Sequence, residues 1–362
     1  MKCGGIITAA GLSSRMGAFK PLLDLNGCPM IVHTVLSMKN AGVDPICVVI
    51  GYRGEELCPI LEELGVIIAV NPDPAGSDML TSVRIGWNRL PDSDAVFLLP
   101  ADMPLMAPDV FRRLQHEAEK EGPIWASATV KGKRGHPALL LSACRARVTE
   151  YRGEGGLRSA MLGVPPLLVE AGDEEMNRDA DRPEDLAAIR RTAMERLGLS
   201  DERCHMLWDR AGTPEPVRRH CAAVADLAEA MARDLIASGG AVDTLLCRSA
   251  GLLHDMLRST PHHAAAAEGE LKRLGFVRLA EAVGSHMSFQ DHPDGFSERT
   301  IVCLADKLIR EDRRVSPEER YAPALEKHPA GTPVGDRIRA DRKQAERLCE
   351  KFFLLTGKRL FG

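Results

Sequence analysis

The stretch Thr8-Ala-Ala-Gly-Leu-Ser-Ser-Arg-Met-Gly-Ala-Phe-Lys20 follows directly on a short apolar run, Gly-Gly-Ile-Ile. A strand that ends in a glycine-bearing turn can aim backbone amides at an anion, and Arg15 and Lys20 can neutralise phosphate oxygens. The stretch is not a P-loop, because five residues separate Gly11 from Gly17 and a proline follows the lysine. Taken alone, it fits a phosphate-binding turn and an ordinary turn with exposed cations equally well.

Short apolar runs alternate with amphipathic segments from residue 3 to about 195. The predicted strands are 3–9, 45–51, 66–71, 95–99, 124–130 and 136–141. The predicted helices between them are 30–41, 55–64, 77–90 and 108–121. Because strand and helix alternate so regularly, we expect an α/β domain over residues 1–196, with a doubly wound, mostly parallel sheet covered on both faces.

The strand signals stop after residue 198. The segment 199–216 is charged and ends in Gly-Thr-Pro-Glu-Pro, which is typical of a connection. Helical spacing of Leu, Ala, Val and Met then recurs over 217–237, 242–256, 268–274, 279–286, 298–311 and 337–355. We therefore predict an all-α second half, divided into a linker at 197–216, a domain at 217–330 and a C-terminal helical extension at 331–362.

Composition argues against several classes of partner. The 47 Lys and Arg against 51 Asp and Glu leave a formal net charge of −4, which offers no footprint for nucleic acid or an anionic membrane. The ten cysteines are scattered without a CxxC pair, so neither a disulfide framework nor a thiolate zinc site is indicated. No window of about eighteen apolar residues and no leader-like segment occurs. We expect a soluble, cytoplasmic protein.

Two acidic segments are candidate metal sites. The apolar run 95–99 leads to Asp102, which stands where ligands bind in open α/β sheets, beyond the carboxyl ends of the strands. A carboxylate there can hold a metal ion or be an ordinary turn residue. Asp181 precedes Glu184 by three residues, a spacing that also fits a helix cap.

In combination, these elements resemble the nucleotidyltransferases of the molybdenum cofactor, in particular the molybdopterin cytidylyltransferase branch. The resemblance covers about the first 190 residues. Its ordered elements are the AAG-S-RMG-K pattern (Ala9, Ala10, Gly11, Ser13, Arg15, Met16, Gly17, Lys20), the Asn-Pro to G-M-S-G series (Asn71, Pro72, Gly76, Met79, Ser82, Gly86), the D-x-P element (Asp102 to Pro104), Gly-His-Pro at 135–137, and the D-x-D-x-PED segment (Asp179, Asp181, Pro183, Glu184, Asp185). The chain departs from the family pattern at Arg182, where threonine is usual, and at Glu154 beside Gly155.

The resemblance implies an enzyme that transfers a cytidylyl group from CTP to molybdopterin and releases pyrophosphate, with a molybdoenzyme as a receiver of the product. It assigns Arg15 and the loop amides to binding of the triphosphate, and Lys20 to the phosphates that react during the transfer. It implies Mg²⁺ held by Asp102 and Asp181, with Asp179 as the alternative ligand. The groups implied for nucleotide binding are Ala9, Ala10, Gly11, Gly17, Asn71 and Ser82.

The AAG opening is what favours CTP over another nucleoside triphosphate in this family. We expect His136 to be a packed side chain rather than a catalyst. A nucleotidyltransferase acting on a sugar phosphate or another small phosphate remains an alternative, because it shares the loop and the aspartates. A cofactor chaperone of the same fold is disfavoured, since it would not need Lys20 and Asp102 together.

In the second half, His254 and Asp255 are adjacent within an apolar helical segment, where burying either without a partner is costly. A shared metal would remove that cost. His220 upstream and Asp306 downstream also have apolar neighbours, so several helices can converge N and O ligands on one divalent ion. This H…HD…D series, over about 204–326, resembles the HD superfamily of metal-dependent phosphohydrolases.

Two further histidines, His263 and His286, resemble those of the HD subset that holds a second metal. Manganese, iron and nickel suit such ligands as well as magnesium does. The chain departs from the pattern at Arg258, where many members carry lysine. The sequence leaves open a phosphohydrolase of unnamed substrate, an inactive metal-bound module, and a regulatory domain that binds a nucleotide.

Overall fold

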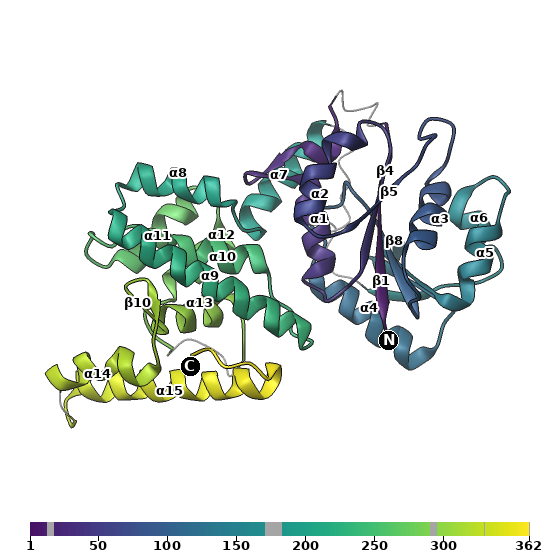
Figure 1. The fold of residues 1–362 in the computed structure, drawn as a ribbon. Helices are drawn as coiled ribbons and strands as arrows, with labels where there is room; N and C mark the ends of the chain where they lie inside the picture. The colour runs from purple at the N-terminus through teal and green to yellow at the C-terminus, as the bar shows by residue number, and fades with distance from the viewer. Residues whose placement is uncertain (13–17, 171–182, 290–294, 329, 362) are drawn as a thin grey trace. The chain divides into compact units, whose positions relative to one another are not determined.

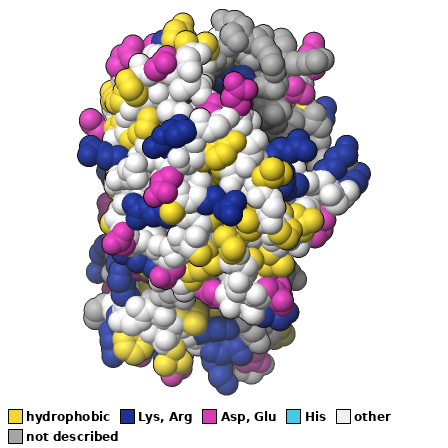
Figure 2. Space-filling model, turned by 90° about the vertical axis from the view of Figure 1, so that its right-hand side faces the viewer, with side chains coloured by type: hydrophobic (Ala, Val, Ile, Leu, Met, Phe, Trp, Pro, Cys, Tyr) yellow, Lys and Arg dark blue, Asp and Glu magenta, His cyan; other side chains and the backbone are white. Residues whose placement is uncertain are grey.

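The computed structural model describes residues 1–12, 18–170, 183–289, 295–328 and 330–361. The chain divides into two compact units, Met1–Thr192 and Ala193–Gly362. Across the described part of the chain, the helices are too short or too polar to span a membrane. On the face drawn in Figure 2, basic and acidic side chains are interspersed, so that face offers no extended area of one charge sign to a charged polymer.

The first unit is built on a seven-stranded sheet with the order β5-β4-β1-β6-β8-β7-β9 (Figure 1). Its strands are β1 (Cys3–Ala9), β4 (Ile46–Ile50), β5 (Ile67–Val70), β6 (Ala95–Pro100), β7 (Trp125–Val130), β8 (Lys133–Leu141) and β9 (Leu167–Glu170). Neighbouring strands are parallel except for β8, which is antiparallel to both β6 and β7. A short hairpin of β2 (Asp24–Leu25) and β3 (Cys28–Pro29) precedes the first helix. The predicted α/β class and the mostly parallel sheet are confirmed.

Helices cover both faces of this sheet because side chains alternate along each strand. On β1, Ile7 belongs to one hydrophobic core and Ile6 to the other. The first core is covered by α1 (Met30–Lys39), α2 (Cys58–Glu63) and α4 (Pro108–Glu121); the second is covered by α3 (Met79–Arg89), α5 (Arg145–Glu150) and α6 (Gly156–Ala160). The apolar runs of the sequence are thus strands buried on both faces.

The sequence did not predict β9, α5 or α6, whereas α7 (Pro183–Arg196) begins within the Asp181–Glu184 spacing that also fits a helix cap. Strand β9 was missed because it lies at the sheet edge, where only every second residue is partly covered, and because it is only four residues long. Helices α5 and α6 span six and five residues, which is too short to show a helical period.

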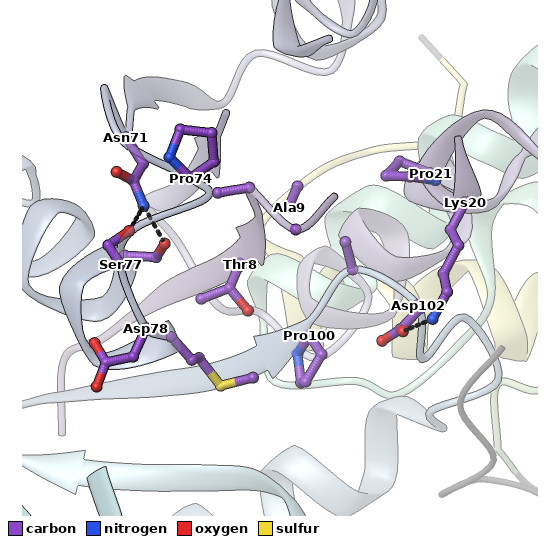
Figure 3. A pocket seen from close by; sticks show the side chains of 15 residues that line it. Thr8, Ala9, Lys20, Pro21, Asn71, Pro74, Ser77, Asp78, Pro100 and Asp102 are labelled. Carbon is purple, nitrogen blue, oxygen red and sulfur yellow. Dashed lines mark hydrogen bonds and ion pairs between the residues drawn. The ribbon is translucent and has the colours of Figure 1, made fainter. Parts of the chain in front are cut away.

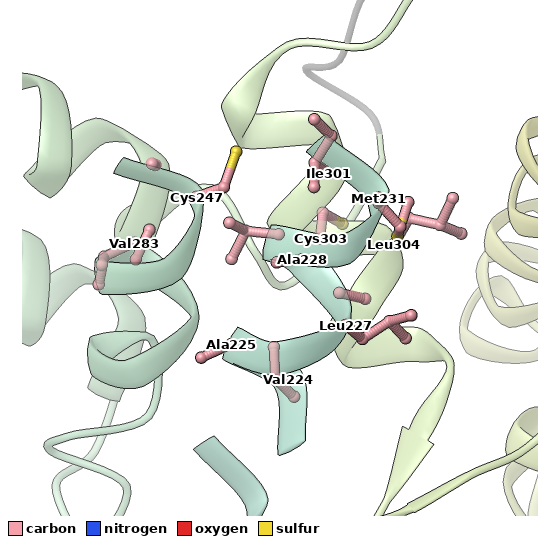
Figure 4. Close-up of a cluster of buried hydrophobic side chains, with 14 of the residues drawn as sticks. Val224, Ala225, Leu227, Ala228, Met231, Cys247, Val283, Ile301, Cys303 and Leu304 are labelled. Carbon is pink, nitrogen blue, oxygen red and sulfur yellow. The ribbon is translucent and has the colours of Figure 1, made fainter. Parts of the chain in front are cut away.

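The second unit is helical, as predicted. Its helices are α8 (Asp201–Ala211), α9 (Glu215–Ala237), α10 (Thr244–Leu253), α11 (His263–Arg273), α12 (Val277–Gly284), α13 (Glu298–Lys307), α14 (Pro317–Lys327) and α15 (Pro333–Thr356). A short hairpin follows α13, with two residues in each of its strands, β10 (Ile309–Arg310) and β11 (Arg313–Arg314). The core gathers around α9, whose Val224, Leu227, Ala228 and Met231 recur at helical spacing, and α9 packs against α10 and α13 (Figure 4).

The prediction of a connection across 197–216 is wrong for the residues of α8. Ser200 caps this helix by accepting from the Arg203 amide. Cys204 and Trp208 are buried in the core of the second unit, and Trp208 Nε1 donates to the Leu252 carbonyl at 2.8 Å. The apolar residues of α8 form only a narrow stripe among charged residues. The charged composition of the segment therefore suggested a linker.

Gly86 lets α3 pack tightly on the sheet, and we predict that Gly86→Ala destabilises the first unit. A Cβ at this position would lie 2.8 Å from Ile6 Cγ2 and 3.0 Å from Val49 Cγ2. We expect the free energy of unfolding to fall by about 1–3 kcal/mol, measured by urea denaturation. Gly269→Ala in α11 is the control, because open space surrounds that position and only the helix propensity changes. Equal effects of the two substitutions would contradict the close-packing argument.

Candidate active sites

An open cavity lies at the carboxyl edge of the sheet in the first unit (Figure 3). It forms there because Thr8 of β1 pairs with Pro100 of the parallel strand β6, so the chain leaves both strands at the same edge. The cavity brings together these predicted residues: Ala9, Ala10, Gly11, Lys20, Asn71, Ser82 and Asp102. The predicted residues Arg15, Gly17, Asp179 and Asp181 lie outside the described residues, and their roles stay predictions.

Lys20 and Asp102 form an ion pair at one end of the cavity. Lys20 Nζ lies 3.1 Å from Asp102 Oδ2, with side chains 12% and 24% exposed. Lys20 begins a 3-10 turn, whereas Asp102 follows β6 in a loop that Thr34 holds by donating to the Ala101 carbonyl at 2.9 Å. A fixed carboxylate beside a partly exposed ammonium can bind a divalent cation and a phosphate oxygen side by side.

Asn71 and Ser82 line the opposite wall, but their polar atoms bond within the protein. Asn71 Nδ2 donates to Ser77 Oγ at 2.9 Å and to Ser82 Oγ at 3.2 Å, and Asn71 Oδ1 accepts from the Asp73 amide at 3.1 Å. Both side chains are buried. Their geometry fits residues that fix the shape of the loop 72–78 rather than groups that reach into the cavity.

Asp78 also lines the cavity but is not among the residues predicted from the sequence. Asp78 caps α3, since its Oδ1 accepts from the Thr81 amide at 3.0 Å and from Thr81 Oγ1 at 3.1 Å. A Ser-Asp pair just before a helical segment is an N-cap signature, and that signal was available.

His136 lies on β8, next to β6, and is half-buried. Burial lowers the pKa of its imidazole below the ordinary value, although a hydrogen bond with the Leu98 backbone acts in the opposite direction. The ring is therefore neutral at pH 7. Its Nδ1 has no hydrogen-bond partner among the described residues.

In the second unit, the structure brings all six predicted metal ligands into one centre. They come from separate elements: His220 on α9, His254 and Asp255 at the end of α10, His263 at the start of α11, His286 after α12, and Asp306 on α13. Two groups of ligand atoms, each within 4.8 Å, share Asp255; they are His220, His254 and Asp255, and Asp255, His263 and His286.

Backbone carbonyls orient three of these imidazoles. Nδ1 of His220 donates to the Glu311 carbonyl at 2.7 Å, Nδ1 of His254 to Gly251 at 2.8 Å, and Nδ1 of His286 to Val283 at 2.7 Å. Because a carbonyl can only accept, each Nδ1 carries a proton, which leaves Nε2 as the ring nitrogen that can bind a metal ion. The buried Nε2 atoms of His254 and His286 have no hydrogen-bond partner within the described chain. Such orphaned nitrogens fit metal ligands.

Carboxylates complete the centre. Asp306 Oδ1 lies 3.2 Å from His220 Nε2 and 3.7 Å from His254 Nε2. Asp255 Oδ2 lies 3.8 Å from His254 Nε2, while Asp255 Oδ1 lies 3.0 Å from His263 Nε2 and 3.5 Å from His286 Nε2. Imidazole and carboxylate together suit manganese, iron and nickel, and both groups of ligand residues include Asp255.

Lys307 is a buried partner of this centre that the sequence reasoning missed. Its Nζ donates to Asp306 Oδ2 at 2.7 Å and to the His286 carbonyl at 3.2 Å. Burial alone would raise the pKa of Asp306, but Lys307, His220 and His254 outweigh it and hold that pKa well below its usual range. The Asp306 carboxylate is therefore ionised. The available signal was a lysine next to an aspartate within an apolar helix.

Known proteins resemble both units. Residues 5–166 match the model of the MobA-like NTP transferase domain, and residues 217–311 match that of the HD domain. The molybdenum cofactor cytidylyltransferase of Escherichia coli is 35% identical over 185 residues, which cover 50% of this chain and 91% of the relative. The chain belongs to the MobA-like nucleotidyltransferase family.

Other relatives of this MobA-like nucleotidyltransferase match its first unit. A 2-aminoethylphosphonate cytidylyltransferase of Lancefieldella rimae is 32% identical over 117 residues, which span 31% of this chain and 47% of the relative. A solved nucleotidyl transferase structure from Methanothermobacter thermautotroptrophicus has 25% identity and a TM-score of 0.47, covering 53% of this chain and 97% of that one. The two relatives thus have names that refer to different acceptors.

We predict that Lys307→Met destabilises the metal-free MobA-like protein through its HD domain. The substitution leaves the Asp306 carboxylate buried without its cation, and breaking such a pair costs about 3–5 kcal/mol. Urea denaturation of protein treated with a chelator measures the effect. Lys272→Met is the control, because Lys272 forms an exposed pair with Glu268 and its loss should change little. A Lys307 effect as small as the control would show that this pair does not support the fold.

Proposed function

We propose that the first unit transfers a cytidylyl group from CTP to molybdopterin and releases pyrophosphate. The observation that carries the proposal is the Lys20–Asp102 pair at the carboxyl edge of the sheet. The likeness to molybdenum cofactor cytidylyltransferase, which covers 91% of that relative, supports the choice of CTP and of the acceptor. The product would then pass to a molybdoenzyme.

The reaction forms a bond between an acceptor phosphate oxygen and the α-phosphorus of CTP, while the bond to pyrophosphate breaks. Such a reaction depends mainly on positioning and on charge stabilisation. Lys20 meets the phosphates, Arg15 and the amides of residues 11–17 bind the triphosphate, and Asp102 with Asp181, or with Asp179 in its place, holds Mg²⁺. Bound Mg²⁺ supplies further neutralisation of the phosphate charge.

The base is read by main-chain groups of Ala9, Ala10 and Gly11. In this proposal Asn71 and Ser82 act indirectly, because their mutual hydrogen bonds hold the wall that faces the nucleotide. A small phosphate or phosphonate is the second candidate acceptor. The likeness to 2-aminoethylphosphonate cytidylyltransferase supports it.

A substrate panel tests the first unit. With Mg²⁺, the purified chain should release pyrophosphate fastest from CTP plus molybdopterin, and more slowly with GTP, with a sugar phosphate, or with 2-aminoethylphosphonate as acceptor. Asp102→Ala should lower turnover by about a hundredfold or more, because it removes a metal ligand from the reacting phosphates. The control is Asp92→Asn, an exposed carboxylate remote from the cavity lining. Equal or faster turnover with another acceptor would overturn the molybdopterin assignment.

We propose that the second unit is a metal-dependent phosphohydrolase that holds one or two divalent ions, such as Mn, Fe, Ni or Mg. The orphaned Nε2 atoms beside Asp255 support this proposal. A bound ion supplies an activated water and neutralises a phosphate. Its substrate would be a phosphate ester or nucleotide related to the cofactor reaction. A regulatory domain that binds a nucleotide without hydrolysing it is the alternative.

Metal analysis and a generic hydrolysis assay test the second unit. After loading with Mn²⁺, the chain should retain about one or two ions, and His254→Ala and Asp255→Ala should lose them. Wild-type protein should hydrolyse p-nitrophenyl phosphate or its diester, and His254→Ala should not. His205→Ala is the control, since that exposed ring stacks on Trp208. Full metal retention in both ligand variants would refute the ligand set, whereas metal binding without hydrolysis would favour the regulatory alternative.

We also place the protein in the cytoplasm. All ten cysteines are free thiols in the structure, and eight of them are buried. Free buried thiols are typical of a reducing compartment. The proposed nucleotide substrate is also found there.

A further inference from the structure

The Arg258 guanidinium lies against the second group of metal ligands. Arg258 follows Asp255 by one turn, and its amide donates to the Asp255 carbonyl at 2.9 Å. Its Nη1 is 3.1 Å from His263 Nε2 and 3.4 Å from each carboxylate oxygen of Asp255, Oδ1 and Oδ2. His263 and Asp255 both belong to the second group, and Asp255 Oδ1 lies 3.0 Å from His263 Nε2 and 3.5 Å from His286 Nε2. The arginine therefore bonds the ligand atoms themselves.

The first group is arranged differently. Asp306 lies beside the first group without belonging to it: Lys307 bonds its Oδ2, while its Oδ1 faces His220 and His254. Lys307 thus bonds the Asp306 oxygen that points away from the imidazoles and leaves the other oxygen to an ion. Arg258, in contrast, contacts His263 Nε2 and the Asp255 carboxylate, which are the groups that would bind an ion in the second position. Like charges repel at such distances, so an ion there and Arg258 in its present position exclude each other.

We propose that Arg258 acts as an internal cation in the second metal position. The centre then holds one divalent ion tightly and takes a second ion only when Arg258 moves away. The side chain can move because it is 52% exposed, whereas Asp255 beneath it is buried. This inference rests on the proposed metal-dependent phosphohydrolase and describes how its second ion is admitted.

A phosphate at the mouth of the centre would favour that movement. A guanidinium binds phosphate oxygens through two parallel N–H donors, which Arg258 can offer once it turns toward solvent. By linkage, an anion that draws Arg258 outward must raise the affinity for the second ion, and the second ion must raise the affinity for the anion. The second ion would therefore bind together with the phosphate substrate.

Metal titration of the full chain tests this inference. Protein stripped with a chelator is titrated with Mn²⁺, bound ions are counted by equilibrium dialysis, and electron paramagnetic resonance detects spin-coupled ion pairs. Wild-type protein should bind one ion tightly and a second more weakly. Arg258→Gln should tighten the second ion by about tenfold to a hundredfold and produce the coupled signal. Inorganic phosphate should tighten the second ion in wild-type protein.

Three variants separate the explanations. Arg258→Lys keeps a cation and should keep the second ion weak. Arg273→Gln is the matched control, because this exposed arginine of α11 pairs with Glu270 instead of the centre. His286→Ala introduced into the Arg258→Gln protein should remove the second ion. Circular dichroism confirms that each variant is folded.

Two equally tight ions in wild-type protein, or no change of the second ion in Arg258→Gln, would overturn the role of Arg258 while leaving the metal centre intact. An absence of any bound ion in wild-type protein would overturn the metal centre itself. The two failures are therefore distinguishable.

Discussion

A charged side chain removed from water needs a partner, and the burial of Asp255 imposes this constraint on the whole second unit. Its two oxygens are met by imidazoles from three helical elements, so those elements must converge on one point. The carbonyls that hold the outer nitrogens of His220, His254 and His286 come from the backbone of the unit itself. The helical packing and the ligand geometry thus depend on each other.

The first unit meets a related constraint with a sheet. Parallel strands bring the ends of β1 and β6 to one edge, where Lys20 and Asp102 neutralise each other. The opposite wall is held by hydrogen bonds of Asn71, whose Nδ2 donates to the hydroxyl oxygens of Ser77 and Ser82. Rigid elements carry the polar groups, while the apolar faces of the sheet supply the stability.

Sequence patterns predicted most of the fold and most of the described site. Buried strands and longer helices carry a clear period, and separated motifs such as His220, His254-Asp255 and Asp306 can be recognised from residue type alone. Elements with few apolar residues, or with apolar residues interspersed among charged ones, were not predicted. The edge strand β9 is half-covered, and α8 presents a narrow apolar stripe, with Trp208 at its centre, among charged residues.

The sequence by itself determined the two-part organisation, the glycine-bearing turn and the residue types of both sites, because these depend on local order along the chain. Only the tertiary structure decided which groups are free to act. It showed that Asn71 and Ser82 satisfy each other, that Lys307 pairs with Asp306, and that Arg258 lies on the ligand atoms of the second group. Hydrogen bonds and ion pairs depend on distances of a few ångströms between residues far apart in sequence, and folding sets those distances.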